Sequence, residues 1–99
     1  MKIVDIKSRN EKEFAAIQRK VKAFVKTAGC NTGRVEFPVE GSRYFIEVEN
    51  DGNLATELAA IVKDSPSGVV ISEKDYKGVY DWSSDTYIRP CSLITFQFR

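Results

Sequence analysis

Residues 34–50, RVEFPVEGSRYFIEVEN, alternate apolar and polar side chains with a period of two on both sides of a short glycine turn. Such alternation is typical of strands with one buried face, and two runs joined by a turn predict a β-hairpin. Pro38 cannot donate a hydrogen bond to a ladder, so it is expected at an edge or an irregular point. The apolar face predicted for this hairpin carries Val35, Phe37, Val39, Tyr44, Ile46 and Val48.

Two amphipathic segments can cover that face. Residues 8–28 open with a capping-box pattern, Ser8 followed by Glu11, and carry apolar side chains at three- and four-residue spacing until Gly29. A shorter helix is predicted after the turn Asn50–Asn53, and it ends before the turn at 65–68.

The remaining apolar runs complete the predicted fold. Strands are expected over 2–6 and 68–74, and a last strand over 92–99. The resulting order, β-α-β-β-α-β with an extra C-terminal strand or hairpin, predicts an α+β, ferredoxin-like fold. This plan has a mostly antiparallel sheet with two helices on one face. Because 99 residues suffice for one hydrophobic core and not for two, residues 1–99 are expected to form a single domain.

Several classes of function find no support in the composition. Cys30 and Cys91 lie far apart in a chain without histidine, so a zinc site would lack ligands, and no metal or cofactor is expected. No apolar run reaches the length of a signal peptide or a membrane span. We therefore expect a cytoplasmic protein with reduced thiols and no membrane contact.

The segment AGCNTGR, residues 28–34, contains a cysteine near glycine and arginine, as in loops where a thiolate attacks a phosphate. Such loops precede a helix, whose N-terminus binds anions and lowers the pKa of the thiol. Cys30 instead follows the predicted end of a helix, where the dipole favours the neutral thiol. We interpret this segment as a helix end and a loop, and no catalytic residue is predicted.

Charge is distributed unevenly along the chain. Residues 1–34 carry nine basic and three acidic residues, whereas residues 35–99 carry six basic and eleven acidic residues. The basic residues of the first helix form a stripe opposite its apolar face, which phosphate groups could follow. No exposed aromatic residue accompanies the stripe, so a solvated surface is the competing interpretation. The candidate nucleic-acid residues are Lys12, Arg19, Lys22 and Lys26.

The turn Asn50–Asn53 contains Gly52 and joins a strand to a helix, an arrangement that lets backbone N–H groups approach a ligand. The full phosphate-binding motifs are absent, and Glu49 and Asp51 would repel an anion. A small ligand with an ammonium group stays open as an alternative. The competing interpretation is that Asn50, Asp51 or Asn53 caps the helix.

Residues 75–90, DYKGVYDWSSDTYIRP, hold the only tryptophan and three of the four tyrosines. Tyrosine and tryptophan dominate the energetics of protein interfaces, and nearby carboxylates favour a basic partner. Alternatively, one or two of these rings are expected in the core. The three aspartates of the segment could also gather around a divalent cation, although their spacing matches no known loop. The candidate partner-binding residues are Tyr80, Asp81, Trp82, Asp85 and Tyr87.

With no catalytic constellation in view, we predict a small non-enzymatic protein-binding module, an inhibitor, adaptor or regulatory subunit. Its partner would be a protein with a basic surface, and a homodimer or other homo-oligomer is included among the possibilities. The two alternatives are a nucleic-acid-binding module that uses the basic stripe and a small-ligand sensor at the Asn50–Asn53 turn.

Overall fold

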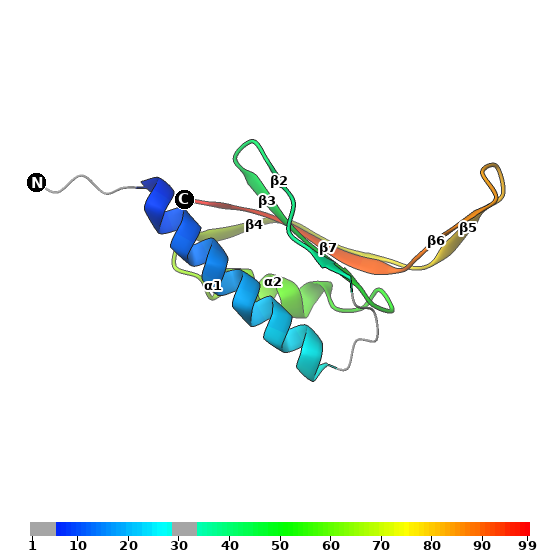
Figure 1. Cartoon of the computed structure of the whole chain (residues 1–99), viewed down its shortest axis with the longest axis horizontal. Coiled ribbons are helices and arrows are strands. Elements are labelled where there is room, and N and C mark those ends of the chain that lie inside the picture. The colour runs from blue at the N-terminus through cyan, green and yellow to red at the C-terminus, as the bar shows by residue number, and fades with distance from the viewer. Residues whose placement is uncertain (1–5, 29–33) are drawn as a thin grey trace, which may run out of the picture.

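The computed structural model describes residues 6–28 and 34–99, and it confirms the α+β class (Figure 1). Two helices lie on one side of an antiparallel sheet, and a two-stranded extension continues beyond the sheet. The elements in chain order are α1 (Ile6–Thr27), β1 (Val35–Glu36), β2 (Val39–Glu40), β3 (Arg43–Glu49), α2 (Ala55–Lys63), β4 (Gly68–Tyr76), β5 (Val79–Asp81), β6 (Thr86–Ile88) and β7 (Cys91–Phe98).

The sheet has β3 and β7 at its centre. Strands β1 and β2 both pair with β3 at one edge, and β4 pairs with the other side of β7. The last strand, predicted as an extra C-terminal strand, is a central strand of the sheet, because β7 pairs on both sides. The strand expected over 2–6 lies outside the described residues up to position 5, and Ile6 already belongs to α1. The ferredoxin-like order depends on that strand and stays a prediction.

The predicted hairpin is confirmed. Val35 pairs with Val48 and Val39 pairs with Tyr44, so each pair shares a face as the alternation predicts. Pro38 lies in the break between β1 and β2, where its carbonyl accepts the N–H of Phe45 at 3.0 Å. The proline therefore interrupts the edge strand without weakening the central ladder.

The core lies between the helices and one face of the sheet. From α1, Ile17, Val21 and Val25 are buried, as the apolar stripe predicts. A cluster of aromatic rings closes one end of this core, with Tyr44 stacked on Phe96 at 5.5 Å between ring centroids. The largest fully buried side chains supplied by β3, α2 and β7 are Ile46, Val48, Leu58, Val62, Ser92, Ile94 and Phe96. Neither described helix combines the length and the apolar character that crossing a bilayer requires.

The side chain of Glu13 joins α1 to the turn before β4. Its carboxylate accepts hydrogen bonds from the Ser65 hydroxyl at 2.6 Å and the Ser67 N–H at 2.8 Å, and it faces Arg9 at 3.6 Å. Burial by itself would raise the pKa of Glu13, but the bonds from Ser65 and Ser67 outweigh it and leave the pKa below its ordinary value.

A group whose pKa is lowered by folding stabilises the protein above its unfolded pKa, and this contribution is lost as the pH falls through the folded pKa. We expect Glu13→Gln to lower the free energy of unfolding by about 1–2 kcal/mol at neutral pH. The difference from the wild type should vanish once the pH falls below the lowered pKa of Glu13. Urea unfolding of both proteins across this range measures it, and a difference that persists in acid would contradict the assignment.

Candidate functional site: the aromatic arm

Strands β5 and β6 form an antiparallel ribbon that projects from the end of the sheet, and we call residues 79–88 the arm (Figure 1). The arm continues β4 and β7, whose pairing ends at Tyr76 and Cys91. Pro90 has no N–H to donate, and the ladder is interrupted there before it resumes with Val79 opposite Ile88. No helix covers either face of the ribbon (Figure 1).

The turn at the end of the arm is held by a single carboxylate. Asp81 accepts the N–H of Ser83 at 3.0 Å, the Ser83 hydroxyl at 2.7 Å and the Ser84 hydroxyl at 3.0 Å. These hydrogen bonds lower the pKa of Asp81, the one from the Ser83 hydroxyl most strongly. Asp85 completes the turn in the left-handed region, with φ of 53°. The turn is thus preorganised, and its conformation presents Trp82 outward.

The aromatic side chains of this segment are exposed. Trp82 is 86% exposed, Tyr87 56%, Tyr76 42% and Tyr80 38%, so the expectation that one or two of them belong to the core is wrong. The ribbon extends past the helices, and none of the four rings joins the buried core (Figure 1). Tyr80 and Trp82 meet edge to face with 4.6 Å between ring centroids, and Tyr80 pairs with Tyr87 across the ribbon.

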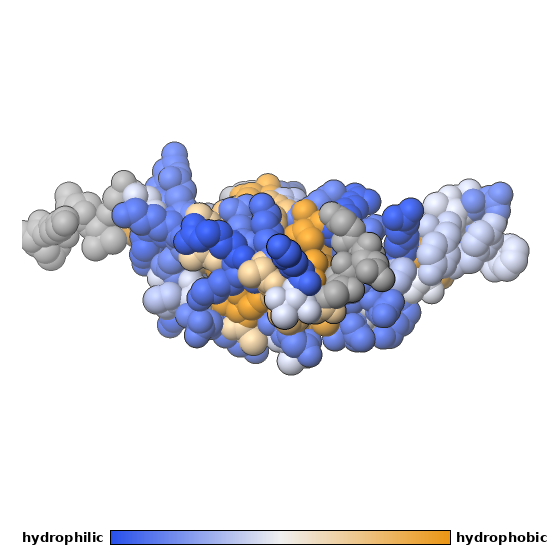
Figure 2. Space-filling model, turned by 60° about the horizontal axis from the view of Figure 1, so that its bottom comes forward, coloured by the Kyte–Doolittle hydropathy of each residue, from blue (hydrophilic) through white to orange (hydrophobic). Residues whose placement is uncertain are grey.

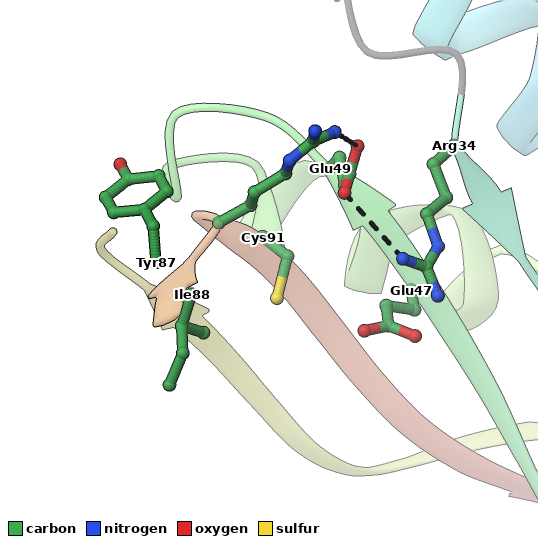
Figure 3. Close-up of a pocket in the computed structure, with 7 residues that line it drawn as sticks. Arg34, Glu47, Glu49, Tyr87, Ile88 and Cys91 are labelled. Carbon is green, nitrogen blue, oxygen red and sulfur yellow. Dashed lines mark ion pairs between the residues drawn. The ribbon is translucent and has the colours of Figure 1, made fainter. Parts of the chain in front are cut away.

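A pocket of about 300 Å³ lies where the arm meets the sheet (Figure 3). Two arginines flank Glu49 in it: Arg89 lies 3.7 Å and Arg34 4.0 Å from the carboxylate. Its lining residues are Arg34, Glu47, Glu49, Tyr87, Ile88, Arg89 and Cys91. Sequence reasoning missed the pocket apart from Tyr87, because its residues come from separate segments and only the pairing of β3 with β7 brings them together.

The pocket contains a thiol but does not activate it. Burial raises the pKa of Cys91, and the neighbouring carboxylates of Glu47, Glu49 and Asp75 raise it further. A thiol with a raised pKa is mostly neutral at pH 7 and is a poor nucleophile. Within residues 6–28 and 34–99, no three histidine, cysteine or acidic side chains gather as metal ligands.

The Asn50–Asn53 turn directs its polar groups inward. Asn50 accepts the N–H groups of Gly52 at 2.7 Å and Asn53 at 3.0 Å, so its oxygen holds the turn and does not cap α2 directly. Asp75, from β4, accepts the N–H of Ala55 at 3.1 Å and also binds the Ser92 hydroxyl. The N-terminus of α2 therefore already faces a carboxylate of the chain itself. The aspartates suggested as cation ligands have separate contacts. Asp75 accepts hydrogen bonds at the N-terminus of α2, whereas Asp81 accepts them in the turn of the arm.

The basic stripe of α1 is exposed as predicted. Lys12, Arg19 and Lys26 are exposed, and Lys22 lies over the ring of Phe37 at 6.0 Å. Figure 2 shows hydrophilic side chains over much of this helical side and the paler arm standing clear of the body. Cys30 lies outside the described residues.

Comparisons of the chain with models of protein families, with curated proteins and with solved structures give no match.

Proposed function

We propose that the chain is a non-enzymatic protein-binding module that contacts its partner through the arm. The observation that carries the proposal is the exposure of Trp82, which is 86%, at the tip of a ribbon that contributes nothing to the core. The other exposed apolar or aromatic side chains of the arm are Val79, Tyr80, Tyr87 and Ile88.

Exposed apolar side chains gathered on one element favour an interface over a purely structural role. Single exposed apolar residues are ordinary on protein surfaces, but contiguous patches mark sites where another molecule binds. Tryptophan and tyrosine contribute most of the binding energy at such sites, because they bury a large area and lose little side-chain entropy. The hydrogen bonds of Asp81 fix the turn beforehand, which reduces the entropic cost of binding.

Charge indicates the kind of partner. Asp81 and Asp85 are the only charged residues between Val79 and Ile88. Two carboxylates beside an exposed Tyr80–Trp82 pair suit a basic surface, since the rings can accept cations by cation–π contact and the carboxylates can form ion pairs. A protein partner with exposed arginine or lysine is therefore the proposal that these residues support.

The exposed stripe of Lys12, Arg19 and Lys26 favours nucleic-acid binding as the second candidate function. That candidate requires binding to DNA or RNA that falls steeply with salt and weakens when Arg19 and Lys26 become glutamate. The absence of binding at low salt would exclude it.

The arm is tested by comparing the proteins captured by the wild type with those captured by Trp82→Ala and Tyr80→Ala. We expect both variants to lose the captured partner while their free energy of unfolding stays within about 0.5 kcal/mol of the wild type. A matched control is available, because Val79 on the arm is 55% exposed and Val39 on β2 is 51% exposed. Both valine variants should retain capture, because Val39 lies on the body and Val79 lies on the ribbon face opposite Tyr80 and Tyr87. If the Trp82 and Tyr80 variants fold and retain the same partners, the proposal is wrong.

A further inference from the structure

The arm and α1 carry opposite charge. The arm has two acidic residues and no basic residue, whereas α1 has seven basic and two acidic residues. Both surfaces are exposed, and each lies outside the contacts that form the core. Each molecule therefore carries the arm and also, on α1, a basic surface of the kind that we propose the arm binds.

The basic stripe of α1 has a regular geometry. Lys12, Arg19 and Lys26 follow one another at seven-residue spacing, which places them along one side of the helix at intervals of roughly 10 Å. Within the described residues, none of the three takes part in a hydrogen bond or an ion pair. Their charges are therefore available to another molecule.

The tip of the arm has the chemistry to bind such a stripe. The rings of Tyr80 and Trp82 lie edge to face, and an aromatic face attracts guanidinium and ammonium groups. Asp85 and the serine-bonded carboxylate of Asp81 belong to the same turn as Trp82 and add electrostatic attraction. Arginine suits this environment better than lysine because its planar group also stacks on aromatic rings.

We propose that the partner of the arm is a second copy of this chain, with the arm of one molecule lying on the Lys12, Arg19 and Lys26 stripe of the other. The inference rests on the function proposed for the arm and names its partner. The arm does not meet α1 of its own molecule, since it projects away from both helices beyond the end of the sheet (Figure 1).

Symmetry gives such a contact two forms. The arm and the stripe are different surfaces, so two copies can exchange arms reciprocally and close a dimer, or copies can add in one direction as a chain. In both forms each contact needs one intact arm and one intact stripe, and these can come from different molecules.

Complementation between two variants tests the proposal. Trp82→Ala removes the main aromatic contact of the arm. The double variant Arg19→Glu with Lys26→Glu reverses two of the three charges of the stripe. By sedimentation velocity, we expect the wild type to associate with rising concentration and each variant alone to bind itself at least ~10-fold more weakly. Mixing the two variants should restore a 1:1 complex, because the intact arm of one meets the intact stripe of the other. Val39→Ala serves as the control and should associate like the wild type.

Salt distinguishes this contact from association through an apolar surface. Raising the ionic strength from about 0.1 M to 1 M shortens the screening length from about 10 Å to 3 Å, so the proposed contact should weaken. Association that is unchanged or stronger at high salt would overturn the proposal, as would a mixture of variants that stays monomeric.

The two proposals can fail separately. A wild type that stays monomeric at millimolar concentration overturns the second copy as partner. If Trp82→Ala and Tyr80→Ala still abolish capture of another protein in that case, the function proposed for the arm stands. If α1 instead binds DNA or RNA while the protein stays monomeric, the stripe belongs to the nucleic-acid alternative and this inference is wrong.

Discussion

Replacing Phe96 by alanine is expected to lower the free energy of unfolding by about 3–5 kcal/mol. Phe96 lies on the central strand β7, is fully buried, and contacts the rings of Phe14, Tyr44 and Phe98. The substitution removes apolar surface from the core and leaves a cavity that the surrounding rings fill only in part. Since small domains are stable by only about 5–15 kcal/mol, much of the native stability would be lost. Urea unfolding followed by circular dichroism measures the change.

Tyr87→Ala is a suitable control for the loss of an aromatic ring, because Tyr87 is exposed on the arm. We expect it to change the free energy of unfolding by no more than about 0.5 kcal/mol. Comparable losses from Phe96→Ala and Tyr87→Ala would contradict the division into a packed body and an exposed arm.

Gly52→Ala is expected to lower the free energy of unfolding by about 2–5 kcal/mol, the sum of a left-handed backbone cost and an overpacking cost. Gly52 has a φ of 75°, and a Cβ atom there would collide with the backbone carbonyl oxygen of Tyr76. Backbone atoms of a paired strand cannot move aside as a flexible side chain can. The turn Asn50–Asn53 or the end of β4 would have to shift.

A substitution at Gly41 distinguishes the left-handed backbone cost from the overpacking cost. Its φ of 62° is also left-handed, but a Cβ atom there would have no neighbour within 4 Å. Gly41→Ala should therefore lose only the backbone part, about 1–2 kcal/mol. Urea unfolding of both variants gives the comparison, and equal losses would show that the close approach of Gly52 to Tyr76 does not matter.

Local patterns predicted the elements better than their arrangement. The alternation around Gly41 gave the hairpin and the apolar stripe gave the inner face of α1, because each depends on residues close in sequence. The central place of β7 could not be found in this way. Which strands pair depends on contacts between distant segments, and the alternation of Ile94, Phe96 and Phe98 suits an edge strand as well as a central one.

The candidate site was predicted in part for the same reason. The composition of residues 75–90 identified the aromatic segment, but exposure depends on whether another element covers it. The pocket had no local signal, since Arg34, Glu49 and Cys91 meet only through the pairing of β3 with β7. Asp75 likewise reaches the N-terminus of α2 from a different strand.

The junction at Tyr76 and Cys91 separates the arm from the strands that contribute to the core. Strands β4 and β7 pair from Gly68 and Phe98 up to this junction, with one irregularity between Val70 and Ser72, so their ladder ends before the arm begins. The two segments that lead into the arm are both held to the Asn50–Asn53 turn. Lys77 donates a hydrogen bond to the carbonyl of Gly52, and the carbonyl of Pro90 accepts one from the N–H of Asn50. Residues 79–88 can therefore vary in length and sequence while the body keeps its core.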